Sequence, residues 1–94
     1  MPGIARLGDT CTGHGCFPPR ANTAASGNVF VNGIGAQRVG DPYAVHCCGP
    51  SCHGGAAAAG SGTVFVNGVG VVRIGDPITC GSSSAVGSGN VMAN

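Results

Sequence analysis

Two segments of the chain repeat almost letter for letter at a spacing of 35 residues. SGNVFVNGIGAQRVGDP begins at Ser26, and SGTVFVNGVGVVRIGDP begins at Ser61. Each copy holds a strand pattern, VFV, followed by Asn-Gly, the dipeptide best suited to the positive φ angles of a type I′ hairpin turn. A second strand then runs through Arg to Gly-Asp-Pro. The repeat therefore predicts similar β-hairpins packed against one another.

Parts of a third copy lie at the two ends of the chain. The tail of the unit, Arg-apolar-Gly-Asp, begins at Arg6, Arg38 and Arg73, and a weaker copy of its head begins at Ser88. The simplest arrangement is a closed set of three, in which the N-terminal tail completes the unit that the C-terminal head begins. This predicts that the chain ends meet and that a pseudo-threefold axis runs through the molecule. The Arg and Asp of each tail are expected to pair at a strand end and not to act in catalysis.

The composition fits a small all-β domain. Gly and Pro make up 25 of the 94 residues, but the valine-rich runs between them indicate short strands and tight turns. We expect one domain over residues 1–94 with no effector extension, whose thin core a metal, disulfides or a partner would reinforce. No apolar run is long enough to cross a bilayer, and MPGIARLGDT lacks the apolar core of a signal peptide. The chain is therefore expected to be made in the cytoplasm.

Charged residues are too sparse for several classes of partner. The chain has four Arg, three Asp, no Lys and no Glu. Nucleic-acid binding needs clustered cations and aromatic stacking platforms, which this chain lacks. So few charges fit either a surface covered by a partner or a polar surface of Gly, Ser and Asn.

Three potential metal ligands follow the three tails at similar distances. His14 and His46 each lie five residues after the Asp of their tail, and Cys80 lies four residues after the Asp of the third. A pseudo-threefold fold would bring these positions together at its axis, where a fourth ligand would complete a tetrahedral structural zinc site. His53, in the stretch CCGPSCHGG that we expect to be a flexible loop, is one candidate for that fourth ligand. The alternatives are Cys11, Cys16, Cys47, Cys48 and Cys52.

The oxidation state of the cysteines stays open at the level of sequence. Six Cys allow 15 complete pairings, and the expected cytoplasmic synthesis favours metal ligation over disulfides. Cys16 and Cys48 both lie seven residues after the Asp of their tail, so symmetry places them near each other and makes a disulfide one option. A bridge between adjacent Cys47 and Cys48 would be strained, which favours two unlinked thiols there. The segment GGAAAAG is expected to be a loop, because it is too short for a stable helix.

The three tails, the dispersed His-His-His-Cys set and the short β-rich chain together resemble the PAAR-repeat proteins. The nearest match to the name-giving Pro-Ala-Ala-Arg is Pro2-Gly3-Ile4-Ala5-Arg6, and the later copies diverge further. The resemblance covers essentially the whole chain and implies a small pseudo-threefold cone of short strands and hairpins around an apical zinc site. Carried over by position, it implies that one structural Zn²⁺ is bound by His14, His46, His53 and Cys80.

The resemblance also implies a function without enzymatic activity. PAAR proteins sit on the end of a trimeric β-helical spike, either the valine-glycine-repeat (VgrG-like) spike of a type VI secretion system or the central spike of a contractile phage tail. The chain is then expected to be a monomer by itself, to bind one per trimer and to sharpen the spike for membrane piercing. It is expected to touch the target membrane only transiently. It would leave the cell with the spike or form part of a virion tail. The alternative is a free-standing, cysteine-rich metal-binding or redox protein.

Overall fold

The repeated VFVNG segments form two short hairpins of the same design. In the computed structural model, which describes residues 1–94, β1 (Phe30–Val31) pairs with β2 (Ile34–Gly35), and β5 (Phe65–Val66) pairs with β6 (Val69–Gly70), both antiparallel. Between the strands of each hairpin, both residues of the Asn-Gly turn have positive φ, with 55° at each Asn. The predicted I′-type turns are therefore confirmed.

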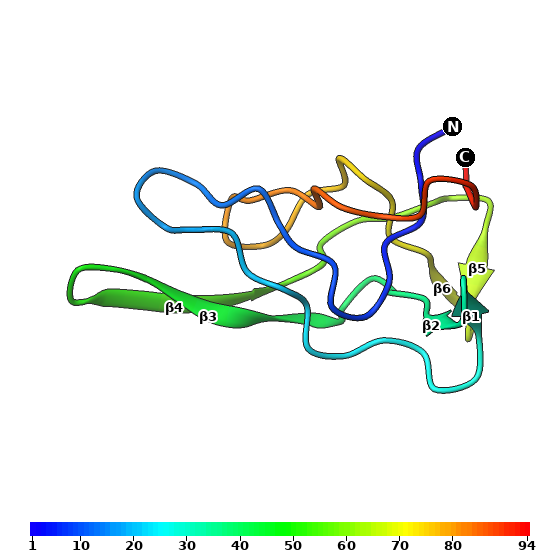
Figure 1. Cartoon of the computed structure of the whole chain (residues 1–94), viewed down its shortest axis with the longest axis horizontal. Helices are drawn as coiled ribbons and strands as arrows, with labels where there is room; N and C mark the ends of the chain where they lie inside the picture. The colour runs from blue at the N-terminus through cyan, green and yellow to red at the C-terminus, as the bar shows by residue number, and fades with distance from the viewer.

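The third copy of this hairpin is assembled from the two ends of the chain. Gly3 pairs with Met92 in an antiparallel bridge, as Gly35 pairs with Phe30 in the first copy and Gly70 with Phe65 in the second. Figure 1 shows the two termini side by side at the end of the molecule that carries β1, β2, β5 and β6. The predicted closed set of three is confirmed.

A ring of three backbone hydrogen bonds joins the three units. Ala5 N–H donates to the Val72 carbonyl, Val72 N–H to the Gln37 carbonyl, and Gln37 N–H to the Ala5 carbonyl, each at 2.9 Å. Each of these residues directly precedes the Arg of a tail, and each is almost completely buried. The cyclic pattern defines the pseudo-threefold axis, because each segment donates to one neighbour and accepts from the other.

Each Arg-apolar-Gly-Asp tail forms a tight turn closed by its own ion pair. The Asp N–H donates to the Arg carbonyl across the turn at 2.9–3.0 Å, and the Gly has a φ between 91° and 95°, as a type II turn requires. The Asp carboxylate accepts from the Arg backbone N–H at 2.8 Å and from the guanidinium. These contacts confirm the expected pairing of the Arg and Asp of each tail.

The core contains two clusters of six buried residues that follow the same threefold pattern. The first cluster is made of the positions two residues before each tail Arg and the positions five residues after the Ser that begins each head. The positions two residues after each tail Asp belong to the second cluster. The first cluster is Ile4, Val31, Ala36, Val66, Val71 and Ala93, and the second is Ala5, Cys11, Tyr43, Ala57, Val72 and Ile78. Equivalent positions of the three units therefore form the core in layers along the axis.

The end opposite the termini is built by insertions of unequal length. β3 (Pro42–Cys48) and β4 (Ser51–Ala56) form an antiparallel hairpin that extends to one extreme of the 38 × 24 × 20 Å molecule, beside the loop of residues 12–21 (Figure 1). The expectation that CCGPSCHGG is a flexible loop is therefore wrong, and Gly54–Ala56 of the expected loop GGAAAAG also lie in β4. Gly49 has a φ of 61° at the first turn position, before Pro50, and this combination closes a two-residue hairpin turn. The molecule is all-β as predicted, and it has no helix that could span a membrane.

The tail turns generate a first prediction. At Gly40, where φ is 95°, a Cβ would meet no atom within 4 Å, so the cost of Gly40→Ala is backbone strain alone, about 1–2 kcal/mol of unfolding free energy. Gly62→Ala is the matched control, because Gly62 is equally open and does not have a positive φ in the left-handed range. Chemical denaturation of both variants checks this. Equal stability of the two variants would contradict the role assigned to the turn glycines.

Candidate metal centre

The four predicted ligands converge at the end of the molecule opposite the termini. One ligand atom from each of His14, His46, His53 and Cys80 can be chosen so that all four lie within 4.8 Å of one another. They come from the three unequal insertions: one from the loop of residues 12–21, two from the β3–β4 hairpin and one from the turn after Ile78. The structure thus brings together the four residues that the family resemblance implied.

The β3–β4 hairpin places two histidines side by side. His46 on β3 lies directly opposite His53 on β4, so their side chains share one face of the hairpin. The Nε2 atom of His53 lies 2.8 Å from that of His46 and 3.0 Å from that of His14. Nitrogen ligands of a tetrahedral zinc ion lie roughly 3.3 Å apart, so both separations are shorter than the required spacing by about half an ångström or less.

Neighbouring groups hold the histidines in a form that can bind a metal. His46 Nδ1–H donates to the Pro18 carbonyl at 2.8 Å, which leaves the lone pair on Nε2 directed at the cluster. Partial desolvation, and then the proximity of His46 and His14, lower the pKa of His53 below its usual value. A lower pKa favours the neutral imidazole near neutral pH, and the neutral form is the one that binds metals.

Phe17 covers the histidine cluster and was missed by the sequence analysis. Its ring centroid lies 4.8 Å from that of His14, 4.2 Å from that of His53 and 5.0 Å from that of His46. The aromatic ring therefore contacts all three imidazoles and limits the access of water to them. A lone Phe in a Gly/Pro-rich loop carries no sequence signal for this role.

Cys80 reaches the cluster only because β4 has a glycine beside it. A Cβ placed on Gly55 would lie 3.1 Å from the Cys80 sulfur and 3.0 Å from the Ile78 side chain. Both contacts are tighter than ordinary van der Waals distances, so a side chain at this position would push Cys80 away. Gly55 thereby makes room for the Cys80 side chain at the cluster.

The remaining cysteines lie outside this group of four. Cys11 is a free thiol in the second core cluster, where its sulfur accepts a hydrogen bond from the Arg20 backbone N–H at 3.2 Å. Cys16 is bridged to Cys48, the pairing that symmetry had indicated. Cys47 is bridged to Cys52, so the expectation of unlinked thiols at Cys47 and Cys48 is wrong. Each of these two adjacent residues has a different partner, which avoids a strained bridge between neighbours.

The donor set suits a metal ion. Three imidazole nitrogens and one thiol sulfur, drawn from three separate insertions, match the tetrahedral N/S coordination of structural metal sites. An ion at this point would join segments that share few contacts of their own. The group could hold a metal ion, and its binding energy would then contribute directly to the stability of this end of the fold.

The position of Gly55 gives a second prediction. Gly55→Ala should displace Cys80 and weaken metal binding by at least about tenfold, because one of four ligands is lost or misplaced. Gly54→Ala is the matched control, since a Cβ there would meet Val45 at an ordinary 3.8 Å. Competition for Zn²⁺ with a chromogenic chelator measures both. Equal affinities would show that Gly55 does not position Cys80.

A third prediction concerns the ligands themselves. His14→Ala and His46→Ala should lower the metal content of the purified protein and reduce its Tm by on the order of 10 °C, because an ion bound by these residues would stabilise the fold. Cys11→Ala should keep the metal and cost only the stability of a small core substitution. Elemental analysis and thermal unfolding give both readouts. Loss of the metal from the Cys11 variant, with retention in the His variants, would refute the assignment.

Comparison with known proteins agrees with this arrangement. A search of curated proteins returned no significant match. The family model described as the PAAR motif, however, matches residues 21–86, which span the β3–β4 hairpin and both complete repeat units. The match covers more than half of the chain and includes His46, His53 and Cys80. The chain therefore belongs to the PAAR-motif family.

Proposed function

We propose that this protein is a non-enzymatic tip for a trimeric β-helical spike. The observation that carries the proposal is the arrangement of apolar side chains at the end of the molecule opposite the metal centre. We call this end the base. Family membership supports a spike-tip role. The partner is a VgrG-like spike of a type VI secretion system or the central spike of a contractile phage tail, and one chain caps one trimer.

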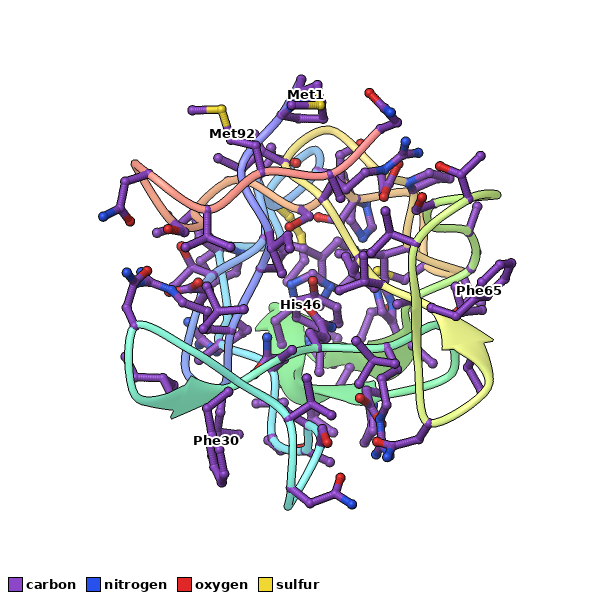
Figure 2. All side chains as sticks on the ribbon, turned by 90° about the vertical axis from the view of Figure 1, so that its right-hand side faces the viewer. Met1, Phe30, His46, Phe65 and Met92 are labelled. Carbon is purple, nitrogen blue, oxygen red and sulfur yellow. A yellow bond between two sulfur atoms is a disulfide. The ribbon has the colours of Figure 1, made fainter.

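The base presents three apolar side chains at equivalent positions. Phe30 and Phe65 are each 59% exposed, and Met92 is 46% exposed. Figure 2, a view onto the base, shows the three at separate corners around the molecule, with Met1 beside Met92. All three occupy the same position of the repeated hairpin, as their pairing with Gly35, Gly70 and Gly3 shows. Exposed apolar groups arranged in this way indicate an interaction surface.

A threefold arrangement of apolar groups suits a threefold partner. The end of a trimer exposes three equivalent strand edges whose unpaired N–H and C=O groups attract further strands. A monomer with three similar units can offer each edge a similar partner, although its own sequence has no exact symmetry. The scarcity of charge on the chain fits this use, because desolvation of charged groups at an interface is costly.

The other end of the molecule forms the point. In this proposal one Zn²⁺, bound by His14, His46, His53 and Cys80, draws the three insertions together. Residues 1–94 act as a single domain. The ion stiffens a region that has little apolar core of its own. The protein is made in the cytoplasm, leaves with the spike, and touches the target membrane only during piercing.

A fourth prediction tests the base as the docking face. The double variant Phe30→Asp/Phe65→Asp should weaken binding to a purified trimeric spike from the same genome by at least about 100-fold, because it removes two apolar contacts and buries two charges. Val45→Asp is the matched control, since Val45 is 58% exposed but lies on β3, away from the base. Size-exclusion chromatography with light scattering and calorimetry give the stoichiometry and affinity.

The outcome separates the proposal from its alternative. One chain per trimer, a bound zinc ion and selective loss of binding in the double variant support the spike tip. Binding that is equally weakened by Val45→Asp would place the docking face elsewhere. Failure to bind any spike, together with reversible thiol oxidation, would favour a free-standing redox protein.

A further inference from the structure

Two disulfides lie beside the metal centre, formed by the four cysteines outside the ligand group. Cys16 lies in the two-residue turn that the His14–Phe17 bridge closes, and it is bonded to Cys48, the last residue of β3, with a Cα–Cα distance of 5.4 Å. Cys16 and Cys48 each follow a predicted ligand histidine by two residues. The bridge therefore joins the same two segments that a metal ion bound by His14 and His46 would join.

The second disulfide has a different position. Because side chains alternate along a strand, Cys48 shares the face of β3 that carries His46, whereas Cys47 lies on the opposite face. Cys47 is paired directly across the hairpin with its disulfide partner, Cys52, and both are exposed. The Cys47–Cys52 bridge thus stays within the hairpin, and only the Cys16–Cys48 bridge links the hairpin to the loop of residues 12–21.

Few other contacts hold the far part of this loop to the hairpin. Between the loop of residues 12–21 and β3–β4, apart from contacts among the predicted ligands, there are two hydrogen bonds and the packing of Phe17 on the histidine rings. The hydrogen bonds run from His46 to the Pro18 carbonyl and, at the base of the loop, from the Ala44 N–H to the Ala21 carbonyl. Loss of the metal would leave that packing, those two hydrogen bonds and the Cys16–Cys48 bridge. The bridge is the only covalent link in this set.

We propose that Cys16 and Cys48 form an oxidation-operated lock at the metal-centre end of the molecule, which we call the apex. The lock keeps the loop of residues 12–21 closed against the β3–β4 hairpin independently of the metal. In the reduced chain, both side chains are thiols and the closure of the apex depends on the ion. On oxidation by a low-molecular-weight disulfide such as oxidised glutathione, the two thiols lose two protons and two electrons and form one S–S bond. The oxidant accepts them, its own S–S bond breaks, and two thiols are released.

The solvent exposure of the cysteines allows this exchange. Cys16 is exposed and Cys48 is half-buried, so a small disulfide can reach the pair. Where the lock closes is inferred from the proposed function. The chain would be made in a reducing cytoplasm and delivered on a spike to an oxidising exterior, where the disulfide would form. The lock itself requires no spike and can be tested without one.

The test compares the full-length protein with two double variants. Cys16→Ser/Cys48→Ser removes the bridge between the loop and the hairpin, and Cys47→Ser/Cys52→Ser is the matched control that removes one disulfide within the hairpin. Each protein is purified reduced, loaded with Zn²⁺ and divided, and one half is oxidised with oxidised glutathione. Peptide mass spectrometry gives the pairing. Transfer of zinc to a chromogenic chelator gives the release rate, and thermal unfolding in EDTA gives the Tm without metal.

In the wild type and the control, oxidation should slow zinc release at least about tenfold and raise the Tm in EDTA by roughly 10–20 °C, because the bridge closes a loop with a sequence separation of 32. The Cys16→Ser/Cys48→Ser variant should show no slowing of zinc release and a smaller rise in Tm, because its remaining Cys47–Cys52 bridge closes a loop with a sequence separation of only 5. Equal effects of oxidation in the two double variants, no effect in the wild type, or a different pairing would overturn the lock. If no zinc is bound, the Tm comparison still decides. Because the assay contains no spike, failure of the docking proposal would leave its result unchanged.

Discussion

The ring of backbone hydrogen bonds among Ala5, Gln37 and Val72 is the constraint on which the rest of the fold depends. It uses main-chain groups, so it makes three segments equivalent even though their side chains are methyl, amide and isopropyl groups. Directly after each of these residues, the chain turns at its Gly-Asp, where the Asp N–H donates to the Arg carbonyl. The amide oxygen of buried Gln37 accepts a hydrogen bond from the Tyr43 hydroxyl at 3.1 Å, whereas its Nε2 is buried without a hydrogen-bond partner.

The two ends of the molecule use this symmetry differently. At the base the three units stay alike, which gives a surface that can meet a threefold partner. Toward the metal centre each unit carries its own insertion, and the ligands are distributed one, two and one among them. A tetrahedral metal ion needs four donor atoms at one point, and three identical loops would supply three or six. The departure from symmetry at this end is therefore what the proposed tetrahedral site would require.

Much of this arrangement could be predicted from sequence, because the spacing of the repeats shows which positions of the three units are equivalent. The equal offsets of His14 and His46 from their tails locate ligands without any knowledge of side-chain packing. The β3–β4 hairpin was missed because Gly, Cys, Pro and His have weak strand preference, and its pairing is stabilised by cross-strand contacts and a disulfide. The role of Gly55 could not be predicted either, since it depends on where Cys80 lies, far away in the sequence.

The pairing of Gly3 with Met92 makes the third corner of the base different from the other two. At the first and second corners of the base, an Asn-Gly turn joins the paired strands covalently. At the third corner no turn connects the two strands, and hydrogen bonds such as that from Ala93 N–H to the Pro2 carbonyl hold them together. The third corner is therefore held together by non-covalent contacts alone. A load that splays the base can carry these two strands apart by breaking hydrogen bonds alone, whereas at the other two corners the Asn-Gly turn keeps the strands joined after their hydrogen bonds break.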